Sequence, residues 1–196
     1  STPIVLREVF ALYDALKQGK EARLERVRPY GDYIAWIGAQ DAAKTEAFWR
    51  AQLRGFREPT PLGIEKLASA GEVEAFEEQR FVLPEAISGK LASFGRQHQL
   101  TMSSVVQGAW ALLLARYSGE DDVLFGATVS GRSAPVLGVD RMVGLFINTL
   151  AVRVKVDREA RALVWLKALQ EQQAELREYE HTPLVQVQGW SEMPRG

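Results

Sequence analysis

MVGLFINTLAVRVKVD, residues 142–157, begins with apolar side chains around a glycine and ends in strict alternation. Val152, Val154 and Val156 recur at every second position, which is the period of a strand with one buried face. Upstream of them a single uncharged amide, Asn148, interrupts an apolar run. Asn often satisfies backbone groups in tight turns, so a structural role is one interpretation of this side chain. The stretch predicts a turn that leads into a half-buried strand.

The composition is that of an ordinary globular domain or a large part of one, with 196 residues, 46% hydrophobic and 25% charged. The net charge of -1 argues against a nucleic-acid or membrane surface that relies on bulk charge. Cysteine is absent, which excludes disulfides and thiolate chemistry. There is no signal-peptide pattern and no apolar run of membrane-spanning length, so a cytoplasmic location is expected. The chain starts at Ser1 and runs directly into an amphipathic pattern, which suggests a piece excised from a longer protein.

Periodicity divides the rest of the chain into helices that flank a small mixed sheet. Helical patterns are expected near residues 2–18, 33–54, 84–98, 102–118 and 162–180, and strands near 122–130 and 151–156, with a weak strand at 76–82. A short turn is expected at 181–188. Helices and strands in this order indicate an α/β or α+β fold.

Catalytic signatures are scarce. His98 and His181 are far apart in the sequence and form neither a zinc pair nor a paired-histidine base. The glycines of 126–131 and 138–144 do not have the spacing of a phosphate-binding loop. Asp121 and Asp122 are adjacent, so their side chains diverge in a regular element and are expected to be solvated. No metal site is predicted.

Four segments in the same order do resemble the condensation domains of nonribosomal peptide synthetases. YGDYIAW (30–36), followed by AFWRAQLRGFREPTPLG (47–63), resembles the segment that joins the two lobes of those domains. MVGLFINTLAVRV (142–154) resembles their Val-Gly-x-Phe-x-Asn-Thr motif with its trailing Arg. The helix and strand of residues 100–132, and YEHTPLVQVQGWSEMPRG (179–196), match what surrounds that motif.

The resemblance implies an incomplete chloramphenicol-acetyltransferase-like lobe, with a mixed sheet flanked by helices. Residues 1–29 would be the last helix of the N-terminal lobe and a connector. Residues 30–72 would be the interlobe helix and linker, and 73–196 part of the C-terminal lobe. The family's paired-histidine motif, two histidines followed after three residues by Asp-Gly, does not occur in the sequence. No catalytic residue is therefore predicted in this chain, and the chain alone is expected to be inactive.

In the complete domain the resemblance implies an acyltransferase that forms the peptide (amide) bond of nonribosomal peptide synthesis, as in antibiotic or siderophore biosynthesis. Its reactants would be aminoacyl or peptidyl thioesters on the phosphopantetheine arms of upstream and downstream peptidyl carrier proteins. An adjacent adenylation domain and the remainder of the condensation domain would be further partners, and no cofactor would bind directly. Two alternatives stay open: a carrier-binding or scaffold fragment without catalysis, and an epimerisation domain of the same superfamily.

The family's tunnel for the phosphopantetheine arms suggests roles for several positions. Tunnel-lining residues would be Asn148, Gly144, Ser130 and Gly131. For Asn148 the amide could instead satisfy backbone groups, and the sequence favours neither role. Structural or interlobe roles are expected for Arg132, Asp140, Arg153, Tyr33 and Trp36. Within this set Arg132 would fix its loop through a carboxylate such as Asp140, and Tyr33 and Trp36 belong to an aromatic packing face.

Overall fold

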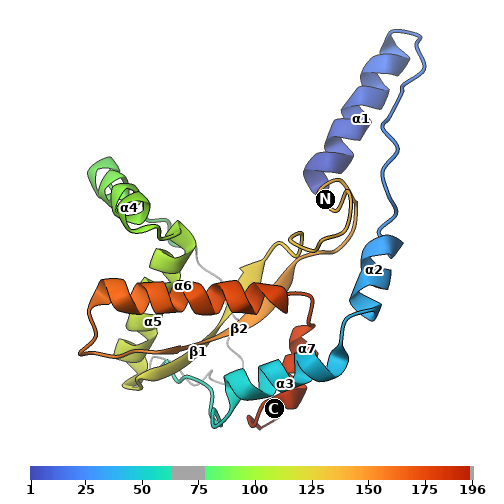
Figure 1. Ribbon diagram of the computed structural model, residues 1–196. Helices are drawn as coiled ribbons and strands as arrows, with labels where there is room; N and C mark the ends of the chain where they lie inside the picture. The colour runs from blue at the N-terminus through green and yellow to red at the C-terminus, as the bar shows by residue number, and fades with distance from the viewer. Residues whose placement is uncertain (63–77, 195–196) are drawn as a thin grey trace, which may run out of the picture. The chain divides into compact units, whose positions relative to one another are not determined.

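The computed structural model describes residues 1–62 and 78–194. Its elements are α1 (Thr2–Lys17), α2 (Gly31–Gly38), α3 (Ala42–Leu53), α4 (Glu85–His98), α5 (Met102–Ser118), β1 (Asp122–Val129), β2 (Asn148–Lys155), α6 (Ala162–Glu178) and α7 (Leu184–Trp190) (Figure 1). Among the described residues, β1 and β2 form a two-stranded sheet. Helices and sheet together confirm the expected α/β class.

The two strands are antiparallel. The start of β1 pairs with the end of β2, since Asp122 bonds to Arg153, and Val156 N donates to Asp121 O at 2.7 Å. Further along, Gly126 lies against Thr149. The alternation predicted for the second strand is confirmed, because Val152 and Val154 are buried while their neighbours are more exposed.

Several boundaries differ from those expected. The long helical pattern of residues 33–54 is two helices, because the Asp41 side chain accepts a hydrogen bond from Lys44 N at 2.9 Å and starts α3 as an N-cap. The turn expected at 181–188 includes a short helix, α7, which begins after Pro183. Of the weak strand at 76–82, residues 76 and 77 lie outside the described residues, and 78–82 form no strand.

The chain divides into two compact units. Unit 1 comprises residues 1–55, 126–150 and 177–196, and unit 2 comprises 56–125 and 151–176. One core cluster of unit 1 comprises Tyr33, Ala134, Val139, Met142 and Phe146, and further apolar side chains of this unit, such as Trp49 and Leu53, are buried as well. In unit 2 the buried apolar side chains come from α5, α6 and the strands, and they include Ala111, Leu114, Val123, Val152, Val154, Leu166 and Leu169.

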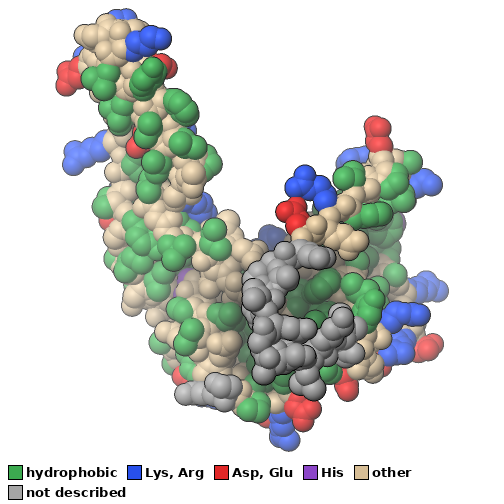
Figure 2. Space-filling model, turned by 180° about the vertical axis from the view of Figure 1, so that it is seen from behind, with side chains coloured by type: hydrophobic (Ala, Val, Ile, Leu, Met, Phe, Trp, Pro, Cys, Tyr) green, Lys and Arg blue, Asp and Glu red, His purple; other side chains and the backbone are tan. Residues whose placement is uncertain are grey.

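Helix α1 carries an apolar surface that the rest of the described chain does not cover. It begins at Thr2 with Pro3 in its first turn, as the sequence predicts, and it has no buried residue. Its exposed apolar side chains are Val5, Leu6, Val9, Phe10, Leu12, Tyr13 and Leu16. Figure 2 shows hydrophobic side chains along this helix at the upper left. Exposed apolar surface of this kind favours association.

Candidate functional site

The loop after β1 and the segment before β2 touch through their backbones. Gly131 has φ +65°, and a Cβ placed there would overlap the carbonyl oxygen of Phe146. Only glycine permits both the left-handed conformation and this approach. Ser130 is exposed, and its hydroxyl accepts a hydrogen bond from Arg132 N at 3.4 Å. Two of the predicted tunnel positions, Ser130 and Gly131, therefore lie on a loop held against residue 146.

Gly144 gives room to an aromatic ring. A Cβ at this position would overlap the ring carbons of Tyr30. The Tyr30 hydroxyl donates to Leu145 O at 2.5 Å, and the Ser1 hydroxyl donates to Gly144 O at 2.7 Å. Gly144 is thus a packing requirement of this segment, and its role beside a substrate stays a prediction.

The Asn148 amide is fully engaged with backbone groups. Its Nδ2 donates to the carbonyl oxygens of Glu180 and Thr182 at 2.8 and 2.7 Å, and its Oδ1 accepts from Thr149 N at 2.9 Å. These bonds tie the start of β2 to the segment between α6 and α7. The structural interpretation of Asn148 has direct contacts in its support, whereas contact with a substrate stays a prediction.

Glu180 joins this arrangement through its side chain, although nothing in the sequence pattern singles it out. The residue is 7% exposed, and its Oε1 accepts hydrogen bonds from Ser133 N, at 3.2 Å, and from the Ser133 hydroxyl. Its backbone carbonyl accepts from Asn148. The available signal was its place in YEHTPL, immediately after a long helix, where a charged residue next to turn residues can bond to a neighbouring loop.

Arg132 bonds to backbone carbonyls and not to Asp140, the carboxylate expected from the sequence. Its guanidinium donates to Val139 O and, at 3.1 Å, to Met142 O. It also lies over the Phe146 ring, 4.1 Å from the centroid. Asp140 instead lies beside the neighbouring Arg141, with 3.8 Å between Oδ2 and Nε. Backbone carbonyls satisfy the guanidinium in place of a carboxylate because the 132–142 loop turns its carbonyls towards it.

Tyr33 and Trp36, the two residues expected on an aromatic packing face, lie against other aromatic rings. Tyr33 is 5% exposed and lies 4.6 Å from Phe146 between ring centroids, and it stacks on Trp36 at 6.0 Å. Burial is the main reason that the pKa of Tyr33 is raised above its usual value, and the nearby Tyr30 and Glu180 add to it. Tyr33 is therefore a neutral core residue near pH 7.

His181 completes the polar edge of this core. Its ring meets Trp36 edge-to-face at 5.4 Å, and burial lowers its pKa, opposed by the Glu178 backbone and the charge of Glu180. Within residues 1–62 and 78–194, His181 Nδ1 and the hydroxyl of the buried Thr182 have no hydrogen-bond partner. The lowered pKa favours the neutral imidazole near pH 7.

Arg153 forms an ion pair within unit 2. Its Nε and Nη2 bond to the two carboxylate oxygens of Asp122 at 2.9 and 2.6 Å, which is a bidentate geometry. The pair links β1 to β2, and the guanidinium also lies 5.4 Å from the Phe56 ring centroid. Asp122 is therefore a paired, half-buried carboxylate, whereas Asp121 is exposed as expected, although it pairs with Arg158 at 2.7 Å. An interlobe role for Arg153 stays a prediction.

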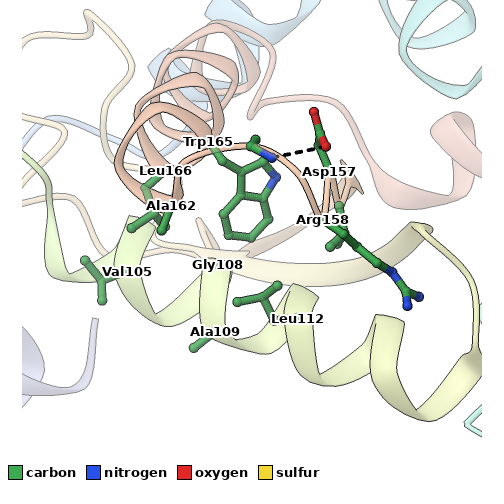
Figure 3. Close-up of a pocket in the computed structure, with 11 residues that line it drawn as sticks. Val105, Gly108, Ala109, Leu112, Asp157, Arg158, Ala162, Trp165 and Leu166 are labelled. Carbon is green, nitrogen blue, oxygen red and sulfur yellow. Dashed lines mark hydrogen bonds between the residues drawn. The ribbon is translucent and has the colours of Figure 1, made fainter.

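An apolar cavity lies in unit 2 between α5, the end of β2 and α6, with a volume of about 490 Å³. Figure 3 shows the Trp165 indole directed towards Gly108 and Leu112 of α5, with Asp157 and Arg158 at one side. Trp165 Nε1 donates to Lys155 O at 2.8 Å, which fixes the ring. A Cβ on Gly108 would lie 2.5 Å from Leu166 Cδ2, so glycine allows α5 and α6 to approach here. No predicted site residue lines this cavity.

The described residues offer no metal centre and no membrane span. Among them no group of three or more His, Asp or Glu side chains could hold a metal ion. None of the helices in the described part of the chain is long and apolar enough to cross a bilayer. In unit 1 the Asn148 amide bonds to backbone groups of Thr149, Glu180 and Thr182, with the Glu180 carboxylate nearby on Ser133.

Solved structures share this fold. The SgcC5 protein from Streptomyces globisporus matches with a TM-score of 0.76 and 23% identity, over 96% of this chain and 43% of that one. The X-domain from teicoplanin biosynthesis matches with a TM-score of 0.72 and 22% identity, over 98% of this chain and 45% of that one. The first condensation domain of the CDA synthetase matches with a TM-score of 0.68 and 19% identity, over 88% and 38%. At such identities the likeness shows the fold alone, and it confirms the expected chloramphenicol-acetyltransferase-like lobe of a condensation-domain fold.

Sequence comparison defines the family. The family model "Condensation domain" matches residues 1–196, and the chain belongs to that family. One of the linear gramicidin synthase subunits of Brevibacillus parabrevis is 52% identical over 196 residues, and chondramide synthase cmdD of Chondromyces crocatus is 44% identical over 196. Both matches cover 100% of this chain but only 4% and 5% of those proteins. The chain therefore spans a small fraction of the curated relatives it matches.

Proposed function

We propose that this chain is part of a condensation domain that forms an amide bond between two carrier-bound thioesters in nonribosomal peptide synthesis. The observation that carries the proposal is the match of the condensation family to every residue of the chain, together with 52% identity to a gramicidin synthase subunit. The same relatives support antibiotic biosynthesis as the pathway class.

In the reaction, the amine of the downstream aminoacyl thioester attacks the carbonyl carbon of the upstream thioester. The new amide bond replaces the carbon–sulfur bond, the upstream phosphopantetheine thiolate leaves, and the proton released by the amine balances the thiolate. Holding both thioesters in one tunnel lowers the barrier by orientation, which contributes about 7–11 kcal/mol in well-aligned systems. The upstream and downstream carrier proteins are the partners, and an adenylation domain adjoins them.

Within this function, Asn148, Gly144, Ser130 and Gly131 line the tunnel for the phosphopantetheine arms. Support comes from Gly131, which meets Phe146 of the unit 1 core cluster, from Gly144, which meets Tyr30 packed against that cluster, and from the uncharged amide of Asn148.

The lobe assignment of residues 1–29, 30–72 and 73–196 is part of the same proposal. The two compact units are each made of several separate stretches of the sequence, whereas each proposed lobe range is one continuous stretch. The units therefore do not test the lobe boundaries. The boundary at residue 72 lies outside the described residues.

The chain alone has no catalysis in this proposal, since no paired-histidine motif occurs in it and a positioned acid or base contributes about 10²–10⁴-fold. The scaffold alternative has an observation in its favour, because the Asn148 amide already makes three hydrogen bonds to the protein backbone.

The test mixes a complete domain that includes this sequence with donor-loaded and acceptor-loaded carriers and follows the acceptor carrier by intact mass spectrometry. The expected result is a mass increase equal to the donor acyl group, absent with an unloaded donor and absent with the chain alone. Inverted stereochemistry of a single loaded residue, without a mass change, would instead assign epimerisation. Carrier binding without either product would assign the scaffold role.

A further inference from the structure

Glu180 carries a buried carboxylate that forms no ion pair with a Lys or Arg of the described residues. Its residue is 7% exposed, and in the described part of the chain no Lys or Arg lies within ion-pair distance of it. An ionised carboxylate is costly to bury unless its oxygens accept hydrogen bonds. The hydrogen bonds from Ser133 N and the Ser133 hydroxyl supply that compensation.

The position of these bonds matters more than their number. Ser133 lies on the same loop as Ser130 and Gly131, and the Gly131 backbone lies against Phe146 O. The Glu180 carbonyl accepts from Asn148 Nδ2 at 2.8 Å. One residue therefore contacts both the 130–133 loop, through its side chain, and Asn148, through its backbone.

We propose that Glu180 is a positioning residue, which holds the 130–133 loop and Asn148 in the one arrangement that aligns the thioester substrates. The inference rests on the proposed function, because it concerns the residues assigned there to the tunnel. Glu180 does not touch the reacting atoms. It acts through Ser133, so removing its carboxylate frees the loop while leaving the Asn148 bonds to the backbone carbonyls in place.

The magnitude follows from the sensitivity of bimolecular alignment. A displacement of about 1 Å in a positioning group costs about 100-fold in rate. Glu180→Ala removes the acceptor for both Ser133 donors, so we expect kcat for peptide-bond formation to fall by about 10- to 100-fold. Glu180→Gln keeps an oxygen at Oε1 that can accept both bonds, and it is expected to restore most of the loss.

The experiment uses the complete domain with loaded carriers and compares wild type, Glu180→Ala, Glu180→Gln, Ser133→Ala and Ser133→Ala/Glu180→Ala. Glu178→Ala is the matched control, since it removes an exposed carboxylate two residues away. Initial rates at varied acceptor carrier give kcat and KM, and the thermal midpoint and folded fraction are measured for each variant. If Glu180→Ala does not fold, Ser133→Ala and Glu180→Gln compared with wild type keep the proposal testable: Ser133→Ala removes one of the two donors to the carboxylate and should lower kcat per folded molecule, and an unchanged kcat would overturn the proposal.

A positioning role predicts that kcat per folded molecule falls, that Glu180→Gln recovers it, and that the double variant is no worse than Glu180→Ala. A purely structural role would lower the thermal midpoint and leave kcat per folded molecule at the wild-type value, which would overturn the proposal. Multiplicative losses in the double variant would also overturn it, because the two residues would then act separately.

The activity of the wild-type domain distinguishes a failure of the proposed function from a failure of the positioning role. A wild-type domain that forms no peptide bond would overturn that function and, with it, a role for Glu180 in aligning thioesters. A wild-type domain that does form product, with full activity in Glu180→Ala, would overturn the positioning role alone. Hydrogen exchange at the Ser133 amide supplies an independent check, since exchange in Glu180→Ala that matches wild type would show that the carboxylate does not hold the loop.

Discussion

Removing the Asn148 amide should destabilise unit 1, because the side chain makes three hydrogen bonds to the backbone. In Asn148→Ala the carbonyls of Glu180 and Thr182 lose their donor, and Thr149 N loses its acceptor. A hydrogen bond of this kind contributes about 0.5–1.5 kcal/mol net. The three together give an expected loss of about 2–4 kcal/mol in the free energy of unfolding.

Asn148→Asp separates the hydrogen bonds from the volume of the side chain. The aspartate has nearly the same shape and can still accept from Thr149 N, but it places a second oxygen where Nδ2 faced two carbonyl oxygens. Repulsion between these oxygens should make Asn148→Asp at least as destabilising as Asn148→Ala near pH 7. Thr128→Ala, an exposed position of β1, is the control for a general loss of polar surface in the sheet.

The assay is urea denaturation followed by tryptophan fluorescence, with hydrogen exchange of the peptide that covers residues 179–184 as a local readout. Both Asn148 variants should lower the urea midpoint, and the 179–184 peptide should exchange faster while α1 is unchanged. The reasoning would be refuted by an Asn148→Ala variant whose unfolding free energy lies within about 0.5 kcal/mol of wild type. If Asn148→Ala is as stable as wild type but the complete domain loses peptide-bond formation, Asn148 contacts the substrate and does not mainly stabilise the fold.

Three further outcomes follow from the contacts described. Gly131→Ala should cost at least about 1–2 kcal/mol, because alanine resists the positive φ and its Cβ would overlap Phe146 O, and urea denaturation measures the loss. A double-mutant cycle of Arg153→Met with Asp122→Asn should give a coupling of about 1–3 kcal/mol, and a coupling near zero would mean that the pair adds nothing. Because burial lowers the pKa of His181 from 6.5, the unfolded chain binds more protons below about pH 6.5, so stability falls as the pH drops through that range. His181→Phe should flatten that pH dependence of the urea midpoint, and an unchanged slope would assign it to another group.

The sequence predicts local elements well where periodicity is strong. The alternation of Val152, Val154 and Val156 matches β2, and Thr2-Pro3 and Gly119 mark helix ends that the structure confirms. The interruption between α2 and α3 was missed because apolar side chains continue at helical spacing across it. Asp41 caps the N-terminus of α3, so a new helix begins at Ala42 although the apolar pattern alone predicts one continuous helix.

The candidate site was only partly predictable, because its contacts join residues far apart in the chain. Asn148 stood out as an amide among apolar residues, yet its partners at 180 and 182 are carbonyl groups, which every sequence position possesses. The same holds for Arg132, whose guanidinium binds carbonyls while the sequence suggested the carboxylate of Asp140. Glu180 looked like one more charge at a helix end, and only its burial against Ser133 separates it from the exposed Glu178.

The interleaving of the two units constrains how such domains can be recombined. The chain passes from one unit to the other at residues 55–56, 125–126, 150–151 and 176–177, and two of these passages fall inside β1 and β2. A single crossover between two related genes would join a unit 1 segment from one parent to unit 1 segments from the other. Chimeras that exchange residues 126–150 together with 1–55 and 177–196 keep Gly131 with its Phe146, and Ser133 with its Glu180. Gene shuffling that exchanges all segments of one unit together should yield more folded progeny than a single crossover.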